Sequence, residues 1–389
     1  MPKLNIQSEI KKIDWDFKNA ETQYLTHAVH RYSGKFIPQI AQAVIKLTTK
    51  TDDLVLDLFC GSGTTLLECA LNKRKSIGVD LNPLAVLISK TKTTPIKASM
   101  LDNFYTEIEE YSRGFNKTES LNLDLFEETG QSSDEIEKAV TQDFRWQDDW
   151  FVKWFREEIR FELIALYRKI ATYSCSVCRN IGLTAFSDIL RKSSNAHSSY
   201  PNVMLDKNKT PPPLPTPRFL ERLKEIISAV KKLDDVLIPD YIPIVIRSNA
   251  NCLPLPDSSI DAVITHPPYI GSIPYAEYGI LSLGWLGHDH KYIDKILTGG
   301  KRQSKDVVER FRNDFRMILA ESWRVLKPRK TLFLMVGNPT VKGQRIDLCE
   351  MTKELALPIG FKLKGLHMRN GINRRANLMG MESLMFFQK

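Results

Sequence analysis

The sequence predicts a doubly wound α/β domain with a mostly parallel sheet, interrupted by a largely helical insertion. Residues 54–88 give the first observation, because an apolar strand-like run, glycines and a helix are followed by a second strand and helix. The second observation is that this alternation stops near residue 99 and resumes after residue 244. The third is the length of 389 residues, which exceeds what one hydrophobic core usually organises.

The first strand is expected at 54–60, because this apolar run suits a strand that is buried on both faces. A helix is expected at 64–71, directly after two glycines. Residues 76–80 predict the second strand, and Pro83 suits the first turn of the helix that follows. This order of elements is a β-α-β-α unit.

Residues 99–244 are expected to form the inserted, mostly helical region. Trp146, Trp150 and Trp154 recur every four residues and predict one long amphipathic helix with these rings in its core. The prolines between 211 and 217 predict an extended, stiff segment before a helix at 219–233. Cys175 and Cys178 have metal-like spacing, but no second close pair accompanies them, so no metal is expected.

The α/β pattern resumes in the last third of the chain. Strands are expected at 261–265, 331–336, 361–363 and 383–387, with a helix at 306–326. The predicted organisation is therefore one α/β domain in two parts, 1–98 and 245–389, separated by an inserted region at 99–244.

Composition narrows the class of protein. Apolar residues make up 42% and charged residues 26%, as in ordinary globular proteins, and no run of about 18 apolar residues occurs. Without a signal segment, a cytoplasmic protein with reduced cysteines is expected. The net charge is +9, and residues 301–389 hold 19 Lys/Arg against 8 Asp/Glu. This excess indicates either a polyanionic partner or a solvated basic surface.

A glycine loop and a carboxylate predict a cofactor that contains a nucleoside. Phe59, Gly61 and Gly63 follow the first strand, and glycines let the backbone turn sharply and approach a ligand. Asp80 ends the next strand, where its carboxylate can accept hydrogen bonds from both hydroxyls of a ribose. Taken alone, Asp80 could instead cap the helix that begins near Asn82.

The segment His266-Pro267-Pro268-Tyr269 follows a strand at the edge where open α/β sheets bind ligands. Pro267 has no N–H, so the turn presents carbonyl oxygens, and Tyr269 offers an aromatic face for a planar base. An amino group that donates to the Pro267 carbonyl and to the residue-266 side chain would have its lone pair directed at an electrophile. The alternative is a Pro-Pro turn that only closes a strand.

These two motifs resemble the signature of class I S-adenosylmethionine-dependent DNA amino-methyltransferases. Asp57-Leu58-Phe59-Cys60-Gly61-Ser62-Gly63 fits the family's Phe-x-Gly-x-Gly loop fully. His266-Pro267-Pro268-Tyr269 fits the catalytic turn, (Asp, Asn or Ser)-Pro-Pro-(Tyr or Phe), at three of four positions. The segment at 30–38 resembles the one that helps to hold the methionine part of the cofactor, and 248–256 resembles the one that contacts its adenine.

The resemblance implies a Rossmann-like fold, S-adenosylmethionine as cofactor and duplex DNA as partner, with a cognate restriction endonuclease as a further partner. It implies base flipping followed by direct attack of the base amino group. The implied cofactor-binding residues are Lys35, Phe36, Pro38, Asp57, Phe59, Gly61, Gly63, Thr64, Asp80, Asn82 and Asn249. The implied catalytic residues are His266, Pro267, Pro268 and Tyr269, and the candidates for nucleic-acid contact are Arg191, Lys192, Lys301, Arg302, Arg369, Arg374 and Arg375.

Two positions depart from the family pattern. Residue 266 is usually Asp in adenine-N6 enzymes and most often Ser in cytosine-N4 enzymes, so His266 favours cytosine-N4 and leaves adenine-N6 as the alternative. A neutral imidazole nitrogen can still accept the amino hydrogen. Asn249 stands where an acidic residue is common, which weakens a charge-assisted bond to the cofactor. RNA methylation and an inactive nucleic-acid binder are further alternatives.

Overall fold

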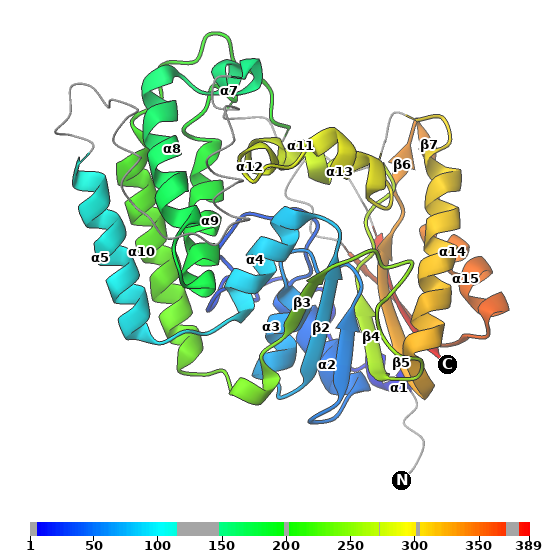
Figure 1. Ribbon diagram of the computed structural model, residues 1–389. Helices are drawn as coiled ribbons and strands as arrows, with labels where there is room; N and C mark the ends of the chain where they lie inside the picture. Colours follow the sequence, from blue (N-terminus) through cyan, green and yellow to red (C-terminus); the bar gives the residue numbers. More distant parts are fainter. Residues whose placement is uncertain (1–5, 115–147, 198–201, 272, 301–303, 371–380) are drawn as a thin grey trace. The chain divides into compact units, whose positions relative to one another are not determined.

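The computed structural model describes residues 6–114, 148–197, 202–271, 273–300, 304–370 and 381–389 (Figure 1). The chain forms two compact units. Unit 1 consists of Met1–Thr94 and Val236–Lys389, and unit 2 consists of Pro95–Asp235. Among the described helices, none has both the length and the apolar character needed to span a membrane.

A mixed sheet forms the centre of unit 1. In its described part, seven strands lie in the order β3-β2-β1-β4-β5-β9-β8. β9 runs antiparallel to β5 and to β8, and the other neighbours are parallel, which confirms the predicted doubly wound, mostly parallel sheet. The strands are β1 (Leu54–Asp57), β2 (Lys75–Asp80), β3 (Ile244–Arg247), β4 (Ile260–Thr265), β5 (Leu326–Gly337), β8 (Lys362–Asn370) and β9 (Met381–Gln388).

Helices of unit 1 connect and cover these strands. The described helices are α1 (Ile6–Ile10), α2 (Pro38–Thr48), α3 (Thr64–Leu71), α4 (Pro83–Thr93), the 3-10 helix η4 (Pro239–Tyr241), α11 (Tyr275–Tyr278), α12 (Ile280–Trp285), α13 (His290–Ile296), α14 (Val307–Val325) and α15 (Leu348–Ile359). A two-stranded hairpin, β6 (Thr340–Val341) and β7 (Gln344–Arg345), follows β5.

The sheet buries apolar side chains on both faces. Leu56 of β1 and Val263 of β4 join the hydrophobic core that includes side chains of α14 and α15. Their neighbours Val55 and Ile264 join a second core, which includes side chains of α2. Successive residues of a strand point to opposite faces, so a continuous apolar run is what a sheet covered on both sides requires. This burial accounts for the unbroken apolar runs in the sequence.

Unit 2 consists of helices in its described part. These are α5 (Ala98–Arg113), α7 (Asp149–Trp154), α8 (Glu157–Ala171), α9 (Ser176–Leu190) and α10 (Pro215–Asp234). Packing within this unit is close. A Cβ added at Gly182 of α9 would lie 2.7 Å from a methyl carbon of Ile170 and 3.0 Å from the Phe104 ring.

The structure corrects two predictions in unit 2. The single long helix predicted around the tryptophans is two helices, because Phe155 is extended at the end of α7 and α8 begins two residues later. Trp146 lies outside the described residues. The proline-rich segment is extended only up to Leu214, since α10 begins at Pro215. Proline is tolerated in the first turn of a helix, where its missing N–H has no intrahelical acceptor.

The topology of unit 1 gathers the ends of three strands at one edge. β1 lies between β2 and β4 and runs parallel to both, so Asp57, Asp80 and Thr265 end their strands at the same edge. The chain passes from β1 to β2 on one side, and β4 joins on the other side. Such a reversal of strand order leaves a crevice at the carboxyl ends of the strands, where open α/β sheets bind ligands.

Candidate active site

Asp57 fixes the start of the glycine loop. Its Oδ1 accepts a hydrogen bond from the Thr265 hydroxyl at 2.7 Å and from the backbone N–H of Phe59 at 3.2 Å. The side chain therefore ties the end of β1 to the end of β4 and to the turn that follows. Burial raises the pKa of the Asp57 carboxyl to about 6.

Two glycines in the loop have left-handed backbone conformations. Gly61 has φ 51° and Gly63 has φ 77°. A Cβ on Gly63 would lie 2.9 Å from Oγ of Ser89 and 3.2 Å from the Ser89 Cα, so the loop lies directly against α4. Gly63 is followed at once by the first turn of α3 at Thr64. Glycine is needed at this turn for conformation and for space.

Asp80 supports the loop from the end of β2. Its Oδ2 accepts from the N–H of Gly61 at 2.9 Å, and its Oδ1 accepts from the N–H of Asn82 at 2.8 Å. The Asn82 side chain caps α4 by accepting from the N–H of Leu84 at 3.1 Å. Asn82 is thus the helix cap, and burial raises the pKa of Asp80 to about 6. A carboxylate has about four acceptor positions, so Asp80 can accept from a ligand as well as from these N–H groups.

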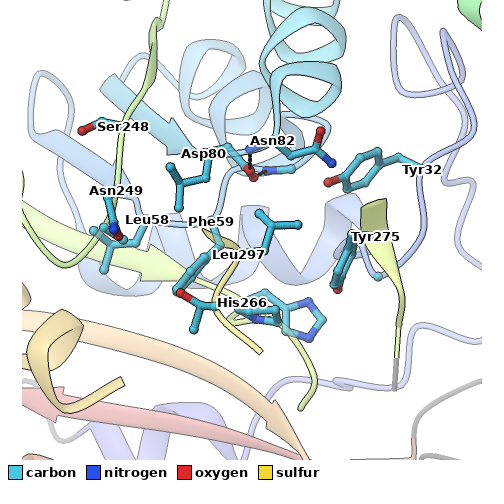
Figure 2. A pocket seen from close by; sticks show the side chains of 16 residues that line it. Tyr32, Leu58, Phe59, Asp80, Asn82, Ser248, Asn249, His266, Tyr275 and Leu297 are labelled. Atoms are coloured by element: carbon cyan, nitrogen blue, oxygen red, sulfur yellow. Dashed lines mark hydrogen bonds between the residues drawn. The ribbon is translucent and has the colours of Figure 1, made fainter. Parts of the chain in front are cut away.

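The glycine loop and the Pro-Pro turn line one cavity of about 600 Å³, a volume that includes the part open to solvent. Figure 2 shows Ser248 and Asn249 at one end and Tyr32 and Tyr275 at the other. A smaller cavity of about 280 Å³ shares Gly61 and other residues with it. The predicted cofactor residues on the larger cavity are Phe59, Gly61, Asp80, Asn82 and Asn249, and those on the smaller one are Lys35, Phe36, Asp57, Phe59, Gly61 and Thr64.

Two predicted cofactor residues line neither cavity. Pro38 is buried at the first turn of α2, and Gly63 is the residue before α3. Lys35 lines the smaller cavity, where its Nζ donates to the carbonyl of His27 at 3.2 Å. Burial lowers the pKa of Lys35. Thr64 also lines that cavity, and its buried hydroxyl has no hydrogen-bond partner among the described residues.

The imidazole of His266 lines both cavities. Its ring stacks on Phe36 with centroids 5.1 Å apart and planes inclined by 8°. Nε2 lies 2.7 Å from the hydroxyl of Tyr269, whereas Nδ1 is buried and has no hydrogen-bond partner among the described residues. Burial lowers the pKa of His266 to about 4, so the ring is neutral at pH 7.

The structure corrects the role expected of Tyr269. Its side chain is 2% exposed and does not line either cavity, so its ring offers no face to a base. The hydroxyl instead donates to Oε1 of Glu382 at 2.9 Å. Gly337 of β5 makes room for the ring, because a Cβ there would lie 2.9 Å from Cε1 of Tyr269. Pro268 lines the larger cavity, and Pro267 is buried.

Sequence reasoning missed several residues that line the larger cavity. Tyr32 and Tyr275 face each other there, with ring centroids 6.2 Å apart and planes inclined by 28°. Leu297 and Thr298 complete this wall. Tyr32 stands inside the 30–38 segment and could have been found there. The others come from residues 275–298, where the sequence has no motif that marks them.

The residues predicted to contact nucleic acid are dispersed. Arg191 and Lys192 lie at the end of α9 in unit 2, and Arg191 donates to the carbonyls of His197 and Asn202 at 3.1 and 3.2 Å. The prediction that Arg369 contacts nucleic acid is wrong, because this residue is 6% exposed and its guanidinium forms an ion pair with Glu382. Lys301, Arg302, Arg374 and Arg375 lie outside the described residues.

The chain is similar to known methyltransferases. Residues 6–91 match a family model described as DNA methylase. The Type II methyltransferase M.MvaI of Kocuria varians is 27% identical over 84% of this chain and 80% of its own length. The Type II methyltransferase M.MjaII of Methanocaldococcus jannaschii is 23% identical over 84% of this chain and 76% of its own. A crystal structure of a methyltransferase from Methanosarcina mazei is 12% identical, covers 89% of this chain and 96% of its own, and has a TM-score of 0.37.

Proposed function

Because the chain is a DNA methyltransferase of the amino-methyltransferase family, we propose that it methylates an exocyclic amino nitrogen of a DNA base with S-adenosylmethionine as donor. The observation that carries this proposal is the shared cavity. The carboxylate suited to a ribose, Asp80, and the turn suited to an amino group, at His266, line the same space.

The residues around the cavity fit S-adenosylmethionine. Asp80 can accept from the ribose hydroxyls as well as from the loop N–H groups, and the Thr64 hydroxyl is without a partner among the described residues. Asn249 lies at the far end of the cavity from Tyr32, where its amide can serve a purine edge. When bound, S-adenosylmethionine supplies a methyl group made electrophilic by the sulfonium. The protein holds the acceptor nitrogen in line with that methyl.

The target base enters the cavity from the DNA. Its amino nitrogen is inside the duplex, so the base must be flipped out at a cost of a few kcal/mol. His266 and the carbonyl of Pro267 accept the two amino hydrogens in this proposal. With Tyr269 buried, Tyr32 and Tyr275 are the tyrosines that line the cavity, and the Phe59 ring lines it as well. Any of these rings can contribute the stacking that offsets part of the flipping cost.

Cytosine-N4 is the base position we propose. Adenine-N6 enzymes resemble this chain less at residue 266, where they carry a carboxylate and this chain carries a neutral imidazole. Unit 2 is proposed to read the target sequence, and Arg191 and Lys192 are its candidates for DNA contact. The two similar Type II methyltransferases support a restriction-modification role, in which a cognate endonuclease cuts the same site.

Product analysis tests this function. The protein is incubated with labelled S-adenosylmethionine and either duplex DNA or RNA, and the nucleic acid is digested to nucleosides for mass spectrometry. N4-methylcytosine in DNA is the expected product. N6-methyladenine would retain the chemistry and reverse the base assignment. Label confined to RNA would overturn the DNA proposal, and no label in either would favour a binder without turnover.

A further inference from the structure

A hydrogen-bonded chain of buried side chains lies behind His266. Arg369 of β8 and Glu382 of β9 are opposite each other in the antiparallel pair, and Nη1 of Arg369 lies 2.5 Å from Oε2 of Glu382. The other carboxylate oxygen accepts from the hydroxyl of Tyr269 at 2.9 Å, and that hydroxyl lies 2.7 Å from Nε2 of His266. Nε of Arg369 donates to the carbonyl of Trp15 at 2.9 Å, which fixes the guanidinium at the far end.

The order of donors in this chain fixes the tautomer of His266. A carboxylate paired with a guanidinium only accepts hydrogen bonds, so the Tyr269 hydroxyl must donate its single proton to Glu382. Burial and the neighbouring Glu382 raise the pKa of Tyr269 well above its usual range, which keeps that proton on the phenol. The phenol oxygen can then only accept from His266. The imidazole is therefore protonated on Nε2 and has a bare lone pair on Nδ1.

The bare nitrogen is the one without a partner. Nδ1 of His266 is buried and has no hydrogen-bond partner among the described residues, although His266 lines the cavity. Buried polar atoms are nearly always bonded, so Nδ1 is available to accept a hydrogen bond from a ligand in the cavity. The imidazole cannot tilt freely, because Phe36 stacks on its face and Tyr269 holds its edge. Both contacts position the Nδ1 lone pair before any ligand arrives.

We propose that Arg369, Glu382 and Tyr269 are positioning residues that hold His266 in the Nε2-protonated tautomer, with Nδ1 as acceptor of the target amino hydrogen. This inference rests on the proposed function and deepens it. As the amino nitrogen forms its bond to the methyl carbon and the methyl–sulfur bond breaks, the nitrogen also loses one proton. That proton passes to Nδ1 while its bonding pair stays on nitrogen, and it leaves later to solvent.

This arrangement suits the charge that develops during transfer. An imidazolium at residue 266 would place its Nε2–H toward Tyr269 and, through it, toward the Glu382 carboxylate. The Glu382 carboxylate is already in place and favours such a charge, whereas the guanidinium of Arg369 paired with it opposes that charge. An amino nitrogen that has just gained a methyl group on an aromatic base is a far stronger acid than an imidazolium. The low pKa of His266, about 4, therefore does not prevent the proton transfer.

The tautomer can be measured without DNA or cofactor. Protein labelled with ¹⁵N in its seven histidine rings is studied by long-range ¹H–¹⁵N correlation at neutral pH, and His266 is assigned from the spectrum of His266→Asn. The expected result is a protonated Nε2 and an unprotonated Nδ1. Tyr269→Phe should shift the ring toward the Nδ1-protonated or a mixed form. Tyr275→Phe is the control, because it removes a phenol oxygen that lines the cavity, and it should leave the His266 tautomer unchanged.

Two results would overturn the proposal: protonation of Nδ1 in the parent protein, or an identical His266 spectrum in Tyr269→Phe. A kinetic arm uses Glu382→Gln, for which kcat should fall about 10- to 100-fold while the Kd for cofactor stays the same. A fall in cofactor affinity instead of kcat would contradict the assigned role. If the tautomer behaves as expected and the parent protein methylates no nucleic acid, the proposed function fails while the tautomer assignment stands.

Discussion

Replacing Asp80 with alanine should weaken cofactor binding, and it also removes the two hydrogen bonds that support the glycine loop. The carboxylate accepts from the N–H groups of Gly61 and Asn82, and in our proposal it also accepts from the two ribose hydroxyls. A hydrogen bond to a charged group contributes about 1.5–3 kcal/mol. Loss of two such bonds amounts to about 3–6 kcal/mol, which corresponds to a Kd raised by about 10²- to 10⁴-fold.

Isothermal titration with S-adenosylmethionine and with S-adenosylhomocysteine measures this effect, and thermal unfolding of each variant reports on the fold. Asp80→Asn is the matched control, because it preserves the shape and one acceptor oxygen while an amide NH₂ replaces the other. Its Kd should lie between those of the parent protein and Asp80→Ala. Parent-like affinity in a folded Asp80→Ala protein would refute the assignment of this carboxylate to the cofactor.

Four further outcomes are expected. Cofactor affinity should be constant above neutral pH and fall as the pH drops through about 6, because Asp80, whose pKa is raised to about 6, loses its ionised, accepting form there. A pH profile of affinity that stays flat down to pH 5 would contradict this. In Asp80→Asn the pH dependence of affinity should disappear. Gly63→Ala should lower the melting temperature more than Gly343→Ala. The positive φ costs about 1–2 kcal/mol at both positions. At Gly63 the added Cβ would also collide with Ser89, whereas no described atom lies within 4 Å of a Cβ at Gly343. Tyr269→Ala should lower kcat for methyl transfer, because it removes the hydroxyl that holds His266, and leave cofactor titration close to that of the parent protein; an equal loss of both would contradict the positioning role of Tyr269. DNA affinity, measured by fluorescence anisotropy, should fall steeply with salt, and a flat dependence would remove the basic C-terminal region from the interface.

The sequence predicted best what local chemistry determines. α3 spans Thr64–Leu71 as expected, because Gly63 supplies the left-handed residue from which that helix begins. The Asp80 carboxylate lies at the end of β2, beside the glycine loop, because the apolar runs specify two adjacent parallel strands. The strands, the glycine loop and Asp80 all lie within about 30 residues of the chain. Contacts with distant residues therefore had little influence on this part of the prediction.

Long-range packing decided what the sequence did not predict. Tyr269 was expected to present its ring to a base, but Glu382, 113 residues away, binds its hydroxyl, and Gly337 leaves space for its ring. Arg369 was expected on a basic surface, and its pairing with Glu382 across two antiparallel strands places it inside. Neither contact leaves a pattern in the local sequence, because each depends on which strands are neighbours.

The most direct test of the whole account is a crystal structure of the protein with S-adenosylhomocysteine and a duplex that carries the target base. The ribose hydroxyls are expected on Asp80, the sulfur facing the His266 turn, and the extruded amino group donating to Nδ1 of His266. An extruded base bound away from His266, or protein side chains lying between the sulfur and the amino nitrogen, would contradict it.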